Sequence, residues 1–187
     1  MPDLSFTQAE RRNFAVPALI AFAILAVVAG ILLLRTPLRA ADLAVTHTAT
    51  LPTHSVYVTD TKLIGVPDAA VDAFYVLATV HIHNRLHVPL FINDITGALT
   101  APDGSVVTAS AAEKSDLPNL YISFPKLKPL ASAPLLREST IPPGSDAEGM
   151  VVFSFPIAAD AWTNRKSAAV TVRFYHQGEF TADIPKP

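Results

Sequence analysis

The sequence predicts a mainly β protein, an antiparallel sandwich with one N-terminal transmembrane helix. One observation behind this is an uncharged run of 21 residues, 14–34, in a chain that is 50% hydrophobic and 16% charged. A second is the pattern after residue 41, where apolar and polar residues alternate with the period of half-buried strands. The third is the short, turn-bounded character of these runs, which favours an antiparallel sandwich over an alternating α/β fold.

The N-terminal part divides into a tail, 1–13, and the predicted transmembrane helix, 14–34. A helix of 21 residues is about 31 Å long, close to the thickness of the hydrocarbon core of a bilayer. A cleaved signal peptide has a shorter apolar core, about 7–15 residues, and small residues at its cleavage site. Here Arg35 and Arg39 follow the apolar run instead. We therefore expect an uncleaved signal anchor that contacts the lipid bilayer through residues 14–34.

The orientation of this anchor does not follow from charge, because two arginines precede the helix and two follow it. The tail of 13 residues and the long polar part after the helix favour the orientation of ordinary signal anchors. We expect a single-pass protein of the bacterial inner membrane, with the N-terminus in the cytoplasm and the C-terminal domain in the periplasm.

After the anchor we expect a linker and first strand region, 35–52, and then a β-sandwich domain, 53–187. The clearest strand is 74–84, FYVLATVHIHN, where Phe74, Val76 and Val80 share one face and His81 and His83 the other. A Pro-Asp-Gly turn at 102–104 predicts a hairpin. Other strands are predicted at 44–50, 55–59, 91–100, 106–109, 149–155, 169–176 and 179–184, and helical turns at 109–113 and 157–165.

A proline- and leucine-rich insertion, 114–143, interrupts this pattern. A disordered linker normally lacks so many large apolar residues, so we expect the insertion to be ordered. A proline-stiffened segment also loses less entropy on docking than a flexible loop. Its large apolar residues either contact a partner or cap an open end of the sandwich; they are Tyr121, Phe124, Leu127, Leu130, Leu135 and Leu136.

Three segments together resemble known families. They are Val80–Asn84, the Asp-Gly hairpin in 100–107, and the Pro-Gly turn at 141–149 that leads into an apolar strand. This order resembles that of membrane-anchored bacterial immunoglobulin-like envelope domains of the FxLYD type, and of the late-embryogenesis-abundant type-2 water-stress domain. The resemblance implies an immunoglobulin-like sandwich and an envelope location, and it brings no catalytic residues.

The residue types exclude several kinds of chemistry. Without cysteine the chain forms no disulfide, thiolate site or zinc finger. The net charge of −2 provides no basic face for nucleic acid. No nucleophile elbow, phosphate-binding glycine loop or helix-borne His/Glu motif is present, so we expect no enzyme and no cofactor. His81 and His83 lie two apart on one strand face, a spacing that chelates a metal when a third ligand faces it, or that serves as an ordinary solvated face.

Two functions are compatible with these residues. The first is a non-enzymatic, membrane-anchored accessory or interaction subunit of an envelope or membrane-protein complex. The alternative is an envelope protein that binds a metal or small ligand through His81 and His83. A stress-related solvating role follows only from the water-stress resemblance, and the moderate charge of 16% counts against it.

Overall fold

The computed structural model describes residues 15–35, 39–57 and 69–186, and for 32–35, 55–57 and 69–71 it describes the backbone alone. The chain divides into two compact units, with the boundary between Leu38 and Arg39. In the first, α1 (Ala15–Arg35) is a 21-residue helix. Within the described residues no helix is both long enough and apolar enough to cross a membrane, so the predicted transmembrane helix 14–34 is not confirmed. The predicted tail, 1–13, lies outside the described residues.

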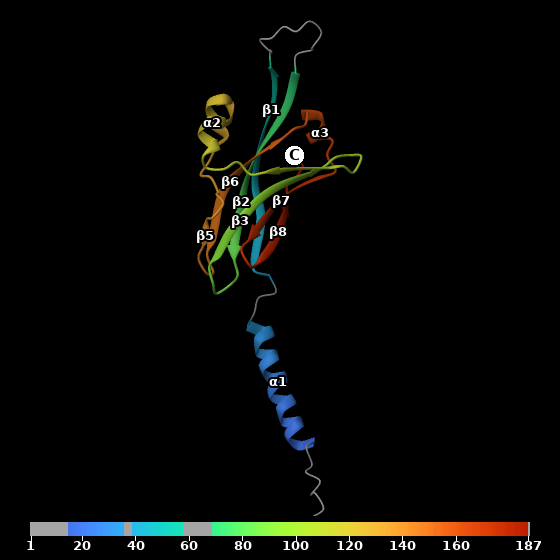
Figure 1. The fold of residues 1–187 in the computed structure, drawn as a ribbon, viewed down its shortest axis with the longest axis vertical. Helices are drawn as coiled ribbons and strands as arrows, with labels where there is room; N and C mark the ends of the chain where they lie inside the picture. Colours follow the sequence, from blue (N-terminus) through green and yellow to red (C-terminus); the bar gives the residue numbers. More distant parts are fainter. Residues whose placement is uncertain (1–14, 36–38, 58–68, 187) are drawn as a thin grey trace, which may run out of the picture. The chain divides into compact units, whose positions relative to one another are not determined.

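The second unit contains two antiparallel sheets, which confirms the predicted mainly β sandwich (Figure 1). The first sheet has the order β1-β2-β6, formed by β1 (Ala41–Tyr57), β2 (Ala69–Asn84) and β6 (Asp146–Phe155). The second has the order β4-β3-β7-β8, and β5 also pairs with the start of β3. Its strands are β3 (Leu90–Thr100), β4 (Val106–Ser110), β5 (Thr140–Ile141), β7 (Ser167–Phe174) and β8 (Gly178–Asp183).

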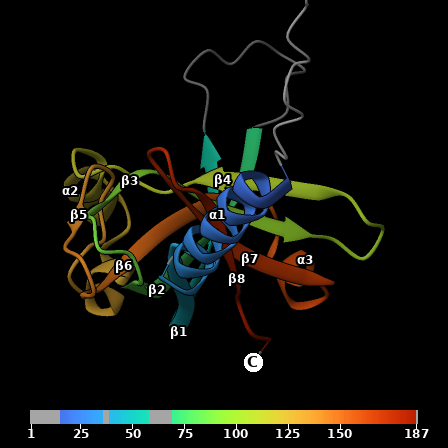
Figure 2. The same cartoon turned by 90° about the horizontal axis from the view of Figure 1, so that it is seen from below.

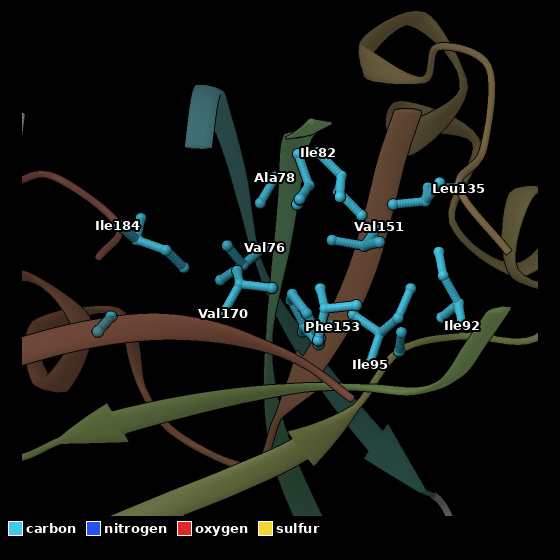
Figure 3. Close-up of a cluster of buried hydrophobic side chains, with 14 of the residues drawn as sticks. Val76, Ala78, Ile82, Ile92, Ile95, Leu135, Val151, Phe153, Val170 and Ile184 are labelled. Atoms are coloured by element: carbon cyan, nitrogen blue, oxygen red, sulfur yellow. The ribbon is translucent and has the colours of Figure 1, made fainter. Parts of the chain in front are cut away.

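The main core lies between the inner faces of these sheets. In Figure 3, Val76 of β2 and Val170 of β7 point toward each other from opposite sheets. Ile82 and Phe153 belong to the same buried cluster and are fully covered. On β2 every second residue from 74 to 82 enters this core, as the period-two pattern predicts.

The connections between the strands contain the helices and a buried asparagine. The insertion forms α2 (Asp116–Ser123) and a 3-10 helix, η1 (Pro125–Leu130), and α3 (Ala159–Thr163) connects β6 to β7. Figure 2 shows α2 and α3 on different sides of the sandwich. At the end of β2, the buried Asn84 amide donates to the backbone oxygens of Val88, Ile141 and Pro142. Its side-chain oxygen accepts from the Leu86 N–H, so this one residue holds two connections together.

Two expectations about elements were wrong. The separate strands predicted at 44–50 and 55–59 are one strand, β1, as far as Tyr57, with a bulge between Val45 and His47; residues 58 and 59 lie outside the described part. Pro52 does not interrupt β1, because β1 is the edge strand of its sheet and can lack an N–H donor there. The helical turn predicted at 109–113 is not helical, because Ala111 bridges to Phe153, and the helix begins later, at Asp116.

Candidate binding face on the three-stranded sheet

The outer face of the β1-β2-β6 sheet has an apolar half and a polar half. The strand register places neighbouring side chains of β2 and β6 together, for example Leu77 with Val152 and His81 with Glu148. The apolar half is formed by Ala49, Leu51, Tyr75, Leu77, Met150 and Val152. The polar half is formed by Asp42, His81, His83, Asp146 and Glu148. An apolar sheet surface needs a cover, and the insertion supplies it.

The insertion covers the apolar half as a cap, here defined as α2 and η1, residues 116–130. Leu117 and Leu127 of the cap pack with Leu77 in a second hydrophobic core, separate from the main one. The Phe124 ring lies 4.9 Å from the Tyr75 ring, centroid to centroid, at a tilt of 49°, a favourable aromatic arrangement. Burial in this region raises the pKa of the Tyr121 phenol.

The structure separates the six predicted contact residues into three groups. Leu127 and Leu135 are buried in the second and main cores, so they cannot contact a partner while the domain is folded. Tyr121, Phe124 and Leu136 are half-buried against the second core. Leu130 is 41% exposed. Sequence reasoning missed Ile122, an exposed apolar residue of α2 that is 77% exposed.

A groove lies where α2 faces the sheet and the segment after β4. Its volume is about 520 Å³, within the range of small-ligand pockets. Tyr75, Phe124 and Val152 provide apolar and aromatic surface, and hydroxyl, amide and charged groups also line it. The remaining lining residues are Ser110, Ala111, Ala112, Glu113, Asp116, Asn119, Leu120, Ser123, Arg137 and Ser154.

Arg137 provides the positive charge of this groove. One of its terminal nitrogens lies 3.2 Å from Glu113 Oε1 and the other 3.1 Å from Asp94 Oδ1. Its Nε is covered and has no hydrogen-bond partner among the described residues. The carboxylates hold the guanidinium beside the second core, so the groove combines an aromatic surface with a fixed ion-pair network. This arrangement suits a ligand or partner segment with an apolar body and a polar end.

His81 and His83 lie together on the polar half, as predicted, and share one carboxylate. His83 Nδ1 is 2.8 Å and His81 Nε2 3.5 Å from the same oxygen, Asp146 Oδ1. Within the described residues no group of three or more His, Asp or Glu side chains could hold a metal ion. The metal hypothesis therefore gains no third ligand here and stays a prediction.

Comparisons with known proteins assign this chain no family and no activity. No protein-family model and no curated protein matches this chain, so the FxLYD and water-stress resemblances are not confirmed. An uncharacterised β-sandwich protein from Clostridium difficile 630 is similar at 9% identity and a TM-score of 0.37, over 80% of this chain and 89% of that one. A functionally unknown protein from Listeria monocytogenes EGD-e is similar at 13% identity and a TM-score of 0.39, over 78% and 89%. Likeness at this level says nothing about function.

Proposed function

We propose that this chain is a non-enzymatic, membrane-anchored accessory subunit that binds a partner protein through its cap. The observation that carries the proposal is the cap itself, which borders a groove of about 520 Å³ and also presents an exposed apolar side chain, Ile122. Leu130 is a second exposed apolar residue of the cap. A cap that served only to cover the sheet needs neither feature, whereas a partner surface needs an apolar anchor point with a polar rim.

The proposed anchor rests on the sequence of residues 14–34, which contains no charged side chain. A tether of this kind would hold the domain beside a membrane-protein partner and raise its effective concentration there without a new contact. We propose the bacterial inner membrane, with the N-terminus in the cytoplasm and the sandwich in the periplasm. Extraction of membranes with alkaline carbonate tests the anchor: an anchored chain stays in the pellet, and release into the supernatant would contradict it.

The groove indicates what the partner presents. Tyr75 and Phe124 offer two aromatic faces, and Arg137, Glu113 and Asp116 offer charges of both signs. A partner segment with an aromatic or aliphatic side chain next to a polar residue would fill the groove and satisfy its rim. We therefore propose a folded or extended segment of a membrane protein rather than a lipid or a nucleic acid.

Site-specific photo-cross-linking in cells tests this proposal on the full-length chain. A photoreactive residue at Ile122 is expected to capture one discrete protein, which mass spectrometry identifies. The control position is Val106 on β4, which is 60% exposed and lies away from the cap. Capture of the same protein at both positions, or of none at Ile122, would contradict a partner site on the cap. A second substitution in the same chain, Leu130→Asp, is expected to weaken the cross-link from position 122.

A further inference from the structure

A second cavity lies at the edge of the sandwich, where β1 comes near β8. Its volume is about 250 Å³, and it shares no residue with the groove under the cap. Three segments provide its walls: β1, the connection that contains α3, and the residues after β8. The lining residues are Thr46, His47, Thr48, Thr50, Trp162, Arg165, Pro185 and Lys186.

Arg165 is the unusual member of this lining because it is only 1% exposed. Its two terminal nitrogens donate to the backbone oxygens of Trp162 (2.8 Å) and Pro185 (3.0 Å). The guanidinium carbon lies 4.0 Å from the centre of the Trp162 ring. Among the described residues no carboxylate forms an ion pair with Arg165, and its Nε has no hydrogen-bond partner. Burial lowers the pKa of the group, as expected for a desolvated cation.

A buried cation of this kind normally has a counter-charge. Arginine is almost never fully buried unless it is paired, because the carbonyl dipoles and the aromatic ring replace only part of its lost hydration. Thr48 Oγ1, in the same lining, is also covered and lacks a partner among the described residues. Two unsatisfied polar groups beside one cavity indicate that the cavity is suited to a polar ligand.

The donors around the cavity define the chemistry of that ligand. Arg165 and Lys186 are cations, threonine hydroxyls add neutral donors, and the described lining contains no Asp or Glu. The carboxylate of Glu148 touches the lining at Thr46 Oγ1, 3.1 Å away, but it forms no ion pair with Arg165 within the described residues. Guanidinium, ammonium and hydroxyl donors together are the set that binds carboxylates and phosphates. We propose that this cavity binds a small oxyanion, a carboxylate or phosphate group, that neutralises Arg165.

The single tryptophan of the chain makes the site measurable, because Trp162 both stacks on Arg165 and lines the cavity. The full-length protein in detergent is titrated with sodium phosphate and, separately, with sodium acetate, at an ionic strength held constant with chloride. We expect a saturable change in tryptophan fluorescence with at least one of them. A response to phosphate alone identifies a phosphate group, and a response to acetate alone a carboxylate. No response to either anion, or the same response to chloride, would overturn the proposal.

Variants then separate the cavity from general surface charge. Thr48→Val removes a hydroxyl with little change of shape and is expected to weaken binding about tenfold, the value of one hydrogen bond to a charged group. Lys186→Gln is expected to weaken binding as well, and Lys166→Gln, a matched loss of charge outside the lining, to leave it unchanged. Equal effects of the two lysine variants, or wild-type affinity in both Thr48→Val and Lys186→Gln, would refute the site. Because Lys186 is exposed, its variant is expected to fold even if Thr48→Val does not. None of these outcomes bears on the partner site of the cap, whose residues lie elsewhere.

Discussion

The cap should contribute to the stability of the domain, and Leu127→Ala tests this directly. Leu127 is fully covered and packs against Leu77 and Leu117 in the second core. The substitution removes three carbon groups from a buried site, worth about 0.8 kcal/mol each by transfer, or about 2.4 kcal/mol. The cavity left behind adds to this because the sheet beneath it cannot collapse freely. We expect a loss of about 3 kcal/mol in the free energy of unfolding.

Leu130→Ala is the matched control, because it is the same substitution in the same short helix at a residue that is 41% exposed. Its expected cost is under about 1 kcal/mol. Urea unfolding of the full-length protein in detergent, followed by Trp162 fluorescence and by far-ultraviolet circular dichroism, gives both values. Trp162 lies in the main core, so its signal reports whether the cap unfolds together with the sandwich. Equal costs for the two variants, or an unchanged Trp162 transition in Leu127→Ala, would refute a cap that is cooperative with the sandwich.

Three other experiments test other parts of the structure. Gly149→Ala should destabilise the domain by about 1–3 kcal/mol in the same urea assay, because the added carbon would lie 2.7 Å from the Leu135 backbone nitrogen. Asn84→Asp should cost at least about 3 kcal/mol at neutral pH, because a carboxylate would face three backbone oxygens. Those oxygens raise the folded-state pKa of the new carboxyl. The variant should therefore keep its stability below the unfolded-state pKa of about 3.9 and lose it as the pH rises through the folded-state pKa. A loss of stability that does not depend on pH would contradict this. The purified protein should carry no stoichiometric zinc or copper, because no group of three or more His, Asp or Glu side chains in the described residues could hold a metal ion. Stoichiometric metal that is lost in a His81→Ala/His83→Ala variant would contradict this.

The alternation of apolar and polar residues was enough to predict the main core. It placed Val76 and Val80 on the inner face of β2, and the structure agrees. The same pattern of residues also indicates the second core. Tyr75 and Leu77 fall on the opposite face, with the histidines, and apolar residues on both faces of a strand indicate burial on both sides. The sequence of β2 could therefore have predicted that a further segment covers this face, but not that the segment is the cap.

Arg165 could not have been predicted in the same way. Its burial depends on the backbone of Pro185, 20 residues along the chain, and on the ring of Trp162, three residues before it. The second contact is local, but the first arises only when the chain after β8 reaches the edge of the sandwich. Local sequence gives no sign of that contact, and an arginine between Asn164 and Lys166 is typical of an exposed loop.

The insertion protects a strand edge as well as a sheet face, and this determines which of its residues are free to bind. β6 is at the edge of its sheet, and the segment before β5 closes that edge: Leu135 N donates to the Met150 carbonyl, and Met150 N donates to the Ala133 carbonyl. An uncovered edge would expose unpaired donors and acceptors to other chains. Residues that satisfy this edge or the second core are needed for folding, so substitutions there would remove partner binding and stability together. Ile122 neither pairs with this edge nor packs in the second core, because it is 77% exposed. Ile122→Asp should therefore lower partner recovery while leaving the urea midpoint of unfolding within experimental error. A fall in both partner recovery and the urea midpoint would show that Ile122 contributes to folding instead.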